Sequence, residues 1–355
     1  MNKLKVFLKR YLCLVLIGSM VLTGCQKETK RDKPIGKVTY AYFDTVSYIY
    51  DYANDTDEEF DKCSSDVFGI LDYYHRLFDI YNSYDGINNL YTINANAGLQ
   101  PVKVDNELIE FLLYCKEVYE LTDGKMNVMM GSVLSIWHQH RQAAMDDPSN
   151  GTVPDMEQLK TASEHISIDS LVIDENEGTV FISDKDAKID VGAIGKGYAT
   201  EKAAQYLIEN EKNGYVLNIG GNIRIIGTKP DGSKWSTGIK NPNDPDGNFP
   251  IKISIADTSC VTSGIYERYY VVKNVRYHHI IDGETLMPAN YFSSVTVITE
   301  DSGLADALST ALFCMDKESG EKIAKKIGNV DVIWIYSDGT VEYTENVKNL
   351  IIVDK

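Results

Sequence analysis

The sequence contains fewer basic than acidic residues. Its 355 residues include 35 lysines and arginines against 52 aspartates and glutamates, so the formal net charge is −17 at pH 7. A protein that binds nucleic acid uses basic residues to neutralise phosphates, and this balance therefore excludes nucleic acid as the main partner. A local basic pocket for a phosphorylated small molecule remains compatible with it.

Cysteines at metal-binding or redox spacing are also missing. The chain has six cysteines, and none stands in a CxxC arrangement. Cys63 and Cys115 fall within apolar helical patterns, and we expect them, with Cys260 and Cys314, to be small buried hydrophobic residues. A disulfide among these four stays open, because a sequence alone cannot pair cysteines. Internal repeats of about 20–50 residues are absent as well, which speaks against a solenoid or a propeller.

Long apolar runs are confined to the N-terminus. Four basic residues among the first ten precede an apolar segment, residues 12–22, that is too short to span a membrane comfortably. It ends in Leu22-Thr23-Gly24-Cys25, which resembles a bacterial lipobox, in which the cysteine is diacylated and becomes the first mature residue. We therefore expect a signal peptide over residues 1–24, a lipid on Cys25 and a place on the outer face of the cytoplasmic membrane. An uncleaved signal anchor is the alternative.

Residues 25–37 are charged, contain Pro34 and have no apolar periodicity, so they are expected to form a tether. Residues 38–355 predict a single α+β domain of mixed sheets with flanking helices. Thr56 and Glu59 form a capping box that opens a helix with apolar residues as far as Phe78, and further helices are expected at 106–121 and 304–315. A loop that ends in a short strand or turn is expected at 81–94, and a further loop at 142–151. Strands are expected at 38–50, 167–173, 179–182, 215–219, 223–227, 235–239, 251–255, 332–336, 341–344 and 350–353, with three more between 269 and 298.

The chain is organised around residues 189–205, IDVGAIGKGYATEKAAQ, which predict a strand end, a glycine-rich turn and a helix. Such a turn presents unpaired N–H groups and a partial positive charge at the helix N-terminus, and both suit a phosphate. Asp190 and Lys196 place a carboxylate and an ammonium at the same corner. Packing alone is the alternative, because GAIGKG is neither GxGxxG nor a P-loop.

Four further stretches carry glycine or polar residues where a plain core strand would not: NIGGN at 218–222, TSGIYER at 262–268, YHHIID at 277–282 and DALST at 306–310. Asp306 and Thr310 lie on one helical face about one turn apart, and their oxygens suit a hard cation such as Mg²⁺. His278 and His279 would point to opposite faces of a strand, so only one can serve a site and the other is expected to be exposed. Taken singly, each stretch is explained equally well by a turn, a helix cap or a bulge.

In combination, these stretches resemble the ApbE family of flavin transferases, the FAD:protein FMN transferases. The likeness covers most of the chain from about residue 38. It is carried, in the family's order, by DVGAIGKGYA at 190–199, LNIGGNI at 217–223, TSGIYER at 262–268, HIID at 279–282 and ADALSTAL at 305–312. The chain departs from the family at 43–45, where FDT stands for MGT, at 124–128, where GKMNV stands for GxFDP, and at Gly283, which replaces a proline.

The resemblance implies Mg²⁺-dependent transfer of FMN from FAD to a Thr or Ser hydroxyl of a partner protein, with release of AMP. Asp306 and Thr310, with the backbone carbonyl of Ala193, would hold the metal. His279 and Asp306 would be the catalytic residues, with His279 transferring the proton. Contacts to FAD would come from Phe43, Tyr81, Lys125, Met126, Asn127, Asp190, Lys196, Ser263, Arg268, His279 and Ile280.

Two alternatives stay open. With water in place of the acceptor, the same residues would make an FAD pyrophosphatase that gives FMN and AMP. Without turnover, the chain would be a flavin-binding lipoprotein. If the protein is a transferase, the resemblance implies that the acceptor is a membrane or extracellular redox protein with a short Thr-containing flavinylation motif. The lipid on Cys25 would bind the enzyme to the membrane from which it reaches this acceptor.

Overall fold

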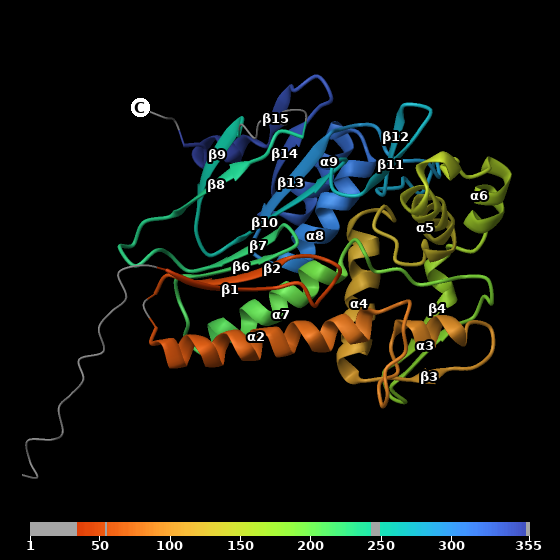
Figure 1. Ribbon diagram of the computed structural model, residues 1–355, viewed down its shortest axis with the longest axis horizontal. Coiled ribbons are helices and arrows are strands. Elements are labelled where there is room, and N and C mark those ends of the chain that lie inside the picture. The colour runs from red at the N-terminus through yellow and green to blue at the C-terminus, as the bar shows by residue number, and fades with distance from the viewer. Residues whose placement is uncertain (1–33, 54, 243–248, 353–355) are drawn as a thin grey trace, which may run out of the picture.

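The computed structural model describes residues 34–53, 55–242 and 249–352 (Figure 1). Its centre is an eight-stranded sheet in the order β1-β2-β6-β7-β10-β13-β14-β15, and each neighbouring pair is antiparallel. The strands are β1 (Ile35–Thr39), β2 (Ser47–Asp51), β6 (Tyr215–Ile219), β7 (Asn222–Ile226), β10 (Ser259–Gly264), β13 (Ser294–Thr299), β14 (Asp331–Ile335) and β15 (Val341–Tyr343). The predicted signal peptide, Cys25 and most of the tether lie outside the described residues.

Three helices stabilise this sheet through one main core. α7 (Gly195–Glu209) packs on β6 and β7, α8 (Ser302–Ala311) packs on β10 and β13, and α2 (Asp57–Phe78) lies along α7 (Figure 1). The predicted capping box opens α2: Glu59 N–H donates to Thr56 Oγ1, and Thr56 N–H donates to the Glu59 carboxylate. The prediction of one mixed α+β domain is confirmed.

A second group of elements lies beside the large sheet, at the right of Figure 1. It contains α3 (Leu90–Ala95), α4 (Asn106–Leu121), α5 (Gly131–Asp146), α6 (Met156–Ser163) and a small antiparallel sheet of β3 (Val102–Lys103), β5 (Thr179–Ile182) and β4 (Leu171–Asp174). The hairpin of β11 (Tyr269–Val272) and β12 (Val275–His278) packs against α5. The hairpin of β8 (Trp235–Ile239) and β9 (Ile251–Ile255), helix α9 (Lys317–Ile327) and the 3₁₀ turns Pro148–Asn150, Ile168–Ser170, Leu312–Cys314 and Glu345–Asn349 complete the described fold.

Several predicted elements are wrong. Residues 38–50 form two strands rather than one, because the chain turns at Phe43 and Asp44, whose φ angles are 56° and 49°. The predicted loop at 81–94 ends in α3, which Asn89 caps by accepting a hydrogen bond from Thr92 N–H. The predicted loop at 142–151 begins as the last turn of α5, since glutamine, alanine and methionine favour a helix even where few residues are buried.

The remaining differences are at element ends. The expected strand at 167–173 begins as the 3₁₀ turn Ile168–Ser170, and the expected helix at 304–315 starts at Ser302 and ends in the turn Leu312–Cys314. The expected strand at 350–353 reduces, among its described residues, to a single bridge between Ile351 and Ile253. Asp306 is therefore in the middle of α8 rather than at its start.

The cysteine prediction is confirmed for the described part of the chain. Cys63, Cys115, Cys260 and Cys314 are all buried, and all four are free thiols. Among the described helices, none combines the length and the apolar character that crossing a membrane requires.

Candidate active site

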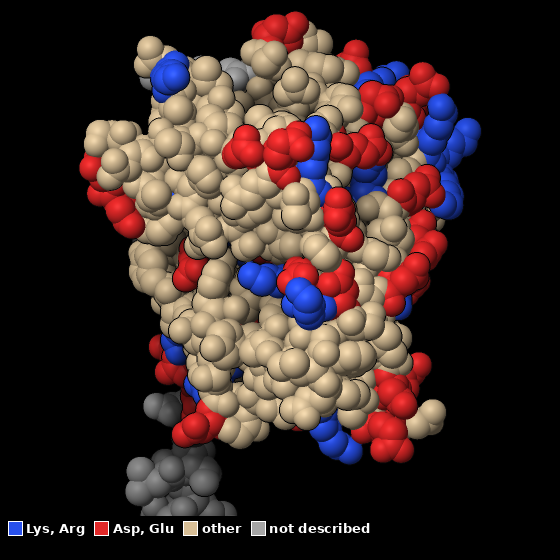
Figure 2. Space-filling view, turned by 90° about the vertical axis from the view of Figure 1, so that its right-hand side faces the viewer, with Lys and Arg blue, Asp and Glu red and all other residues tan. Residues whose placement is uncertain are grey.

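A cavity of about 610 Å³ lies where the C-terminal end of α2, the glycine-rich turn, α5, the β11–β12 hairpin and α8 meet. It brings together the residues for which the resemblance implied a role in flavin or metal binding, although the ligand of each stays a prediction. These residues are Phe43, Tyr81, Lys125, Met126, Asn127, Asp190, Ala193, Lys196, Ser263, Arg268, His279, Ile280, Asp306 and Thr310. Figure 2 shows the side of the molecule that lies at the right of Figure 1, where acidic and basic side chains of the described residues are intermixed without a continuous basic patch.

The end of the cavity that contains the predicted metal ligands depends on a close approach of α7 to α8. A Cβ on Gly197 would lie 2.3 Å from Ser302 O and 2.4 Å from Asp306 Cβ, so only glycine fits there. The approach lets Gly197 N–H donate to Asp306 Oδ2 at 2.8 Å, and Lys196 Nζ lies 3.6 Å from the same oxygen. Asp306 is only 4% exposed, and its Oδ1 has no hydrogen-bond partner among the described residues. One carboxylate oxygen is thus fixed by the protein while the other remains available to a ligand.

Thr310 follows Asp306 by one turn of α8. Its Oγ1 lies 3.2 Å from Ser263 Oγ on β10, and Ser263 Oγ also lies 2.7 Å from Ser309 Oγ. Ala193, in the glycine-rich turn, lines the same cavity. Carboxylate, hydroxyl and carbonyl oxygens are the ligands that Mg²⁺ prefers, so the residues present fit this ion.

A buried ion pair holds the start of α8 in place. Glu201 on α7 accepts hydrogen bonds at its Oε2 from Ser302 N–H at 2.9 Å and from Arg224 Nε at 3.3 Å. Both side chains are nearly inaccessible to solvent. Burial raises the pKa of Glu201, and the charge of Arg224 opposes that rise. The pair ties α7, α8 and β7 into one unit beneath Asp306.

The two histidines at the end of β12 have different surroundings. His278 is buried, with Nε2 donating to Ala289 O at 2.8 Å and Nδ1 accepting from Ile280 N–H, so its role is structural. His279 lines the cavity and is half-buried, with Nδ1 3.1 Å from Arg268 O. Because a carbonyl can only accept, Nδ1 carries the hydrogen and Nε2 keeps its lone pair. The expectation that one of the two is exposed is wrong.

The charge state of His279 follows from its surroundings. Burial, followed by the nearby charge of Arg268, lowers the pKa of His279 to about 3. The imidazole is therefore neutral at pH 7 and able to accept a proton at Nε2. Bound phosphate would raise this pKa, because an adjacent negative charge favours the protonated ring.

The segment that departs most from the family motif also lines the cavity. Lys125 Nζ forms ion pairs with Glu284 at 2.7 Å and with Asp282 at 3.7 Å. The Asn127 side chain donates to Ile166 O and accepts from Met129 N–H, and Met126 is buried. These contacts shape the turn that leads into α5. Asp190 N–H donates to Val128 O and so joins this turn to the glycine-rich one.

Sequence reasoning missed a hydrogen-bonded pair on α5, His138 and Arg141. Arg141 Nη2 donates to His138 Nδ1 at 2.9 Å, and the His138 ring lies 5.4 Å from the Tyr81 ring. Both side chains line the cavity, as does Asp44. The available signal was the spacing of three between His138 and Arg141, directly after the buried Trp137, which places both on one face of a helix.

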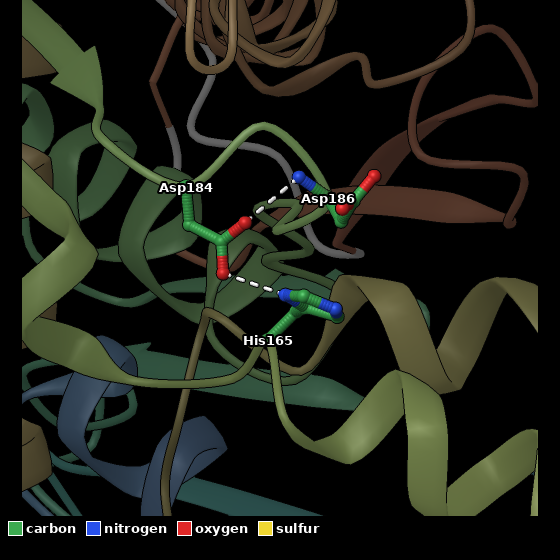
Figure 3. A group of neighbouring side chains, drawn as sticks. All are labelled: His165, Asp184 and Asp186. Atoms are coloured by element: carbon green, nitrogen blue, oxygen red, sulfur yellow. Dashed lines mark hydrogen bonds and ion pairs between the residues drawn. The ribbon is translucent and has the colours of Figure 1, made fainter.

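A second group of potential metal ligands, His165, Asp184 and Asp186, lies outside the cavity lining (Figure 3). His165 Nδ1 lies 2.7 Å from Asp184 Oδ2, and Asp184 Oδ1 accepts from the backbone N–H of Asp186. The Asp186 carboxylate itself is paired with Lys185. These contacts fasten the segment that precedes Ile166, the residue bound by Asn127, and we assign them a structural role.

This fold is shared with bacterial proteins of known structure. The structure of the ApbE protein of Thermotoga maritima superposes with a TM-score of 0.79 at 27% identity, covering 90% of this chain and 100% of that one. The flavin transferase ApbE of Vibrio cholerae superposes with a TM-score of 0.73 at 23% identity, covering 90% and 99%, and at that identity it supports the fold alone.

Sequence comparison then identifies the family. The ApbE family model matches residues 43–334, and the chain belongs to the ApbE family. A similar relative, from Treponema pallidum, is 30% identical over 266 residues, which are 71% of this chain and 72% of that protein. Another, from Klebsiella pneumoniae, is 27% identical over 277 residues, 77% and 81% of the two chains. Both relatives are FAD:protein FMN transferases.

Proposed function

We propose that this protein transfers FMN from FAD to a Thr or Ser hydroxyl of a partner protein and releases AMP, with Mg²⁺ as the metal. The relatives' activity supports the flavin transfer. The observation that carries the finer reaction is the meeting, in one cavity, of Asp306 with an available oxygen, Thr310, Lys196 and a neutral imidazole, His279. Asp306 and Thr310 would serve a metal, Lys196 a phosphate and His279 a proton.

Each step of the reaction has a residue to perform it. The acceptor oxygen forms a bond to the FMN phosphorus, the bond from that phosphorus to the oxygen that leaves with AMP breaks, and His279 Nε2 takes the hydroxyl proton. Lys196 places its ammonium at the start of α7, where helix N–H groups also favour anionic oxygens. Mg²⁺ held by Asp306, Thr310 and the carbonyl of Ala193 would supply charge neutralisation on the diphosphate and stabilise the leaving AMP.

We also propose that Cys25 carries a lipid and that the enzyme works at the outer face of the cytoplasmic membrane. The lipobox-like Leu22–Cys25 segment supports this, and the first described strand begins at Ile35, so about ten residues separate the lipid from the fold. Incorporation of labelled palmitate into the wild-type chain, and its loss in Cys25→Ser, is the expected result. Equal labelling of the two would contradict the proposal. The acceptor would be a membrane or extracellular redox protein with a Thr-containing motif.

Product analysis tests the reaction itself. The purified protein is incubated with FAD and Mg²⁺, with and without an acceptor domain carrying a Thr-containing flavinylation motif, and the products are separated by chromatography. AMP that forms only with the acceptor, and not with a chelator present, is the expected result. AMP with free FMN in the absence of acceptor would instead establish a pyrophosphatase, and bound FAD without either product would establish a flavin carrier.

A further inference from the structure

Two arginines in the cavity have no carboxylate to pair with. Arg141, on α5, and Arg268, between β10 and β11, both line it, yet within the described ranges neither lies within 4.0 Å of an acidic oxygen. Asp44 and Asp190 line the same cavity but do not form ion pairs with them. Within the described part of the chain, the guanidinium of Arg268 makes one long hydrogen bond, 3.4 Å, to the backbone oxygen of Asp44.

The two guanidinium groups also act on each other. Burial, followed by the charge of Arg268, lowers the pKa of Arg141. Holding two like charges in a partly buried cavity costs free energy, and an anion bound between them would offset that cost. Asp190 opposes the shift of the Arg141 pKa but forms no ion pair with this guanidinium, and perturbed pKa values of this kind cluster at functional sites.

His138 orients Arg141 for such a ligand. Arg141 Nη2 donates to His138 Nδ1 at 2.9 Å, which requires a neutral ring with its hydrogen on Nε2. Burial and the charge of Arg141 lower the pKa of His138 and so keep that ring neutral. The guanidinium has five N–H groups in a rigid fork, so several donors remain for a planar or tetrahedral oxyanion.

We propose that Arg141, oriented by His138 and assisted by Arg268, forms an anion subsite that binds a phosphate group of the flavin nucleotide. The inference rests on the proposed function, which supplies a ligand with phosphates. It adds a binding residue that lies outside every motif of the family resemblance. The phosphate could belong to the FMN half or to the AMP half of FAD, and the experiment separates the two.

The test compares the binding of ligands with and without a phosphate group. Dissociation constants for riboflavin, FMN and AMP are measured in metal-free buffer on the full chain in detergent, by flavin fluorescence for the first two and by calorimetry for AMP. The variant Arg141→Met keeps the apolar length of the side chain and removes its charge. The matched control is Arg276→Met, which makes the same change on an exposed strand position outside the cavity lining.

We expect the loss of affinity to be confined to the ligands that carry a phosphate. Arg141→Met weakens binding of FMN, of AMP or of both by about 10- to 100-fold, while riboflavin affinity is unchanged and Arg276→Met resembles wild type. A loss for FMN alone assigns the subsite to the flavin half, and a loss for AMP alone assigns it to the adenylate half. His138→Phe, which keeps a ring against Tyr81, gives a smaller loss with the same selectivity.

Either of two results would overturn the proposal. Unchanged affinity for both phosphate ligands would remove Arg141 from the site, and an equal loss for riboflavin would reduce it to a structural role. Failure of the proposed function is a separate outcome, because binding is measured without metal or acceptor. A chain that binds FMN through Arg141 but transfers none would retain the subsite and lose the transferase assignment.

Discussion

Replacement of Gly197 by alanine tests whether the contact between α7 and α8 holds Asp306 in its place in the cavity. The new methyl group would lie 2.3 Å from Ser302 O, a backbone atom that can yield only if α8 moves. Overpacking of this kind costs about 1–3 kcal/mol, and loss of the Gly197 N–H bond to the Asp306 carboxylate adds about 1.5–3 kcal/mol. Because alanine favours a helix over glycine by about 1 kcal/mol, we expect a net destabilisation of about 1.5–5 kcal/mol.

Gly69 provides the matched control for this experiment. It lies in α2, is exposed, and a Cβ there meets no atom within 4 Å, so Gly69→Ala is expected to stabilise the protein by about 0.5–1 kcal/mol. Thermal unfolding followed by circular dichroism compares both variants with wild type, and flavin transfer is assayed in parallel. Gly197→Ala should melt lower and lose activity. If it melted with wild type and kept full activity, the two helices would not hold Asp306 as described.

Three further predictions follow from the same contacts. Asp306→Asn keeps an acceptor for Gly197 N–H but removes the charge, so the variant should melt near wild type. Its rate of flavin transfer, corrected for the rate that remains with a chelator, should fall by more than about 100-fold. Full activity of the variant would contradict metal binding by Asp306. The folded protein keeps His279 neutral down to about pH 3, whereas the unfolded chain protonates it near its ordinary value of 6.5, so the free energy of unfolding should fall as the pH drops through this range. His279→Gln should make that fall shallower in urea unfolding at a series of pH values, and an unchanged slope would contradict a neutral His279 ring in the folded protein. Arg224→Met leaves the Glu201 carboxylate buried without its cation and should cost about 3–5 kcal/mol in the same assay, with part of the loss recovered when Glu201→Gln is added; a simply additive double variant would show that the two are not coupled.

The sequence predicted best where apolar spacing or a specific turn residue decides the structure. The capping box at Thr56, the glycine-rich turn before α7 and the central strands are of this kind. The turn at Phe43 and Asp44 could not be predicted, because neither residue is a glycine although both have left-handed φ angles. Its hydrogen bonds are to residues far away in the sequence: Phe43 N–H donates to His75 Nδ1, and Arg268 donates to Asp44 O. The last turn of α5 was missed because helix propensity, rather than an apolar stripe, continues it.

In the candidate site, too, the sequence predicted some residues and missed others. Motifs that combine glycine with polar residues stood out from their surroundings, and the fold brings them to one cavity. Arg141 carries no such signal, since a single arginine on a polar helix resembles any solvated residue. Its importance depends on the absence of an acidic partner within reach, and only the folded arrangement of α5 against the β11–β12 hairpin reveals that.

The most direct test of the central claim is the intact mass of an acceptor protein after incubation with this chain, FAD and Mg²⁺. We expect a mass increase equal to one FMN phosphoester, matched by an equal amount of AMP, and neither product with Asp306→Asn. An acceptor of unchanged mass under conditions where FAD is bound or consumed would contradict the assignment as a flavin transferase.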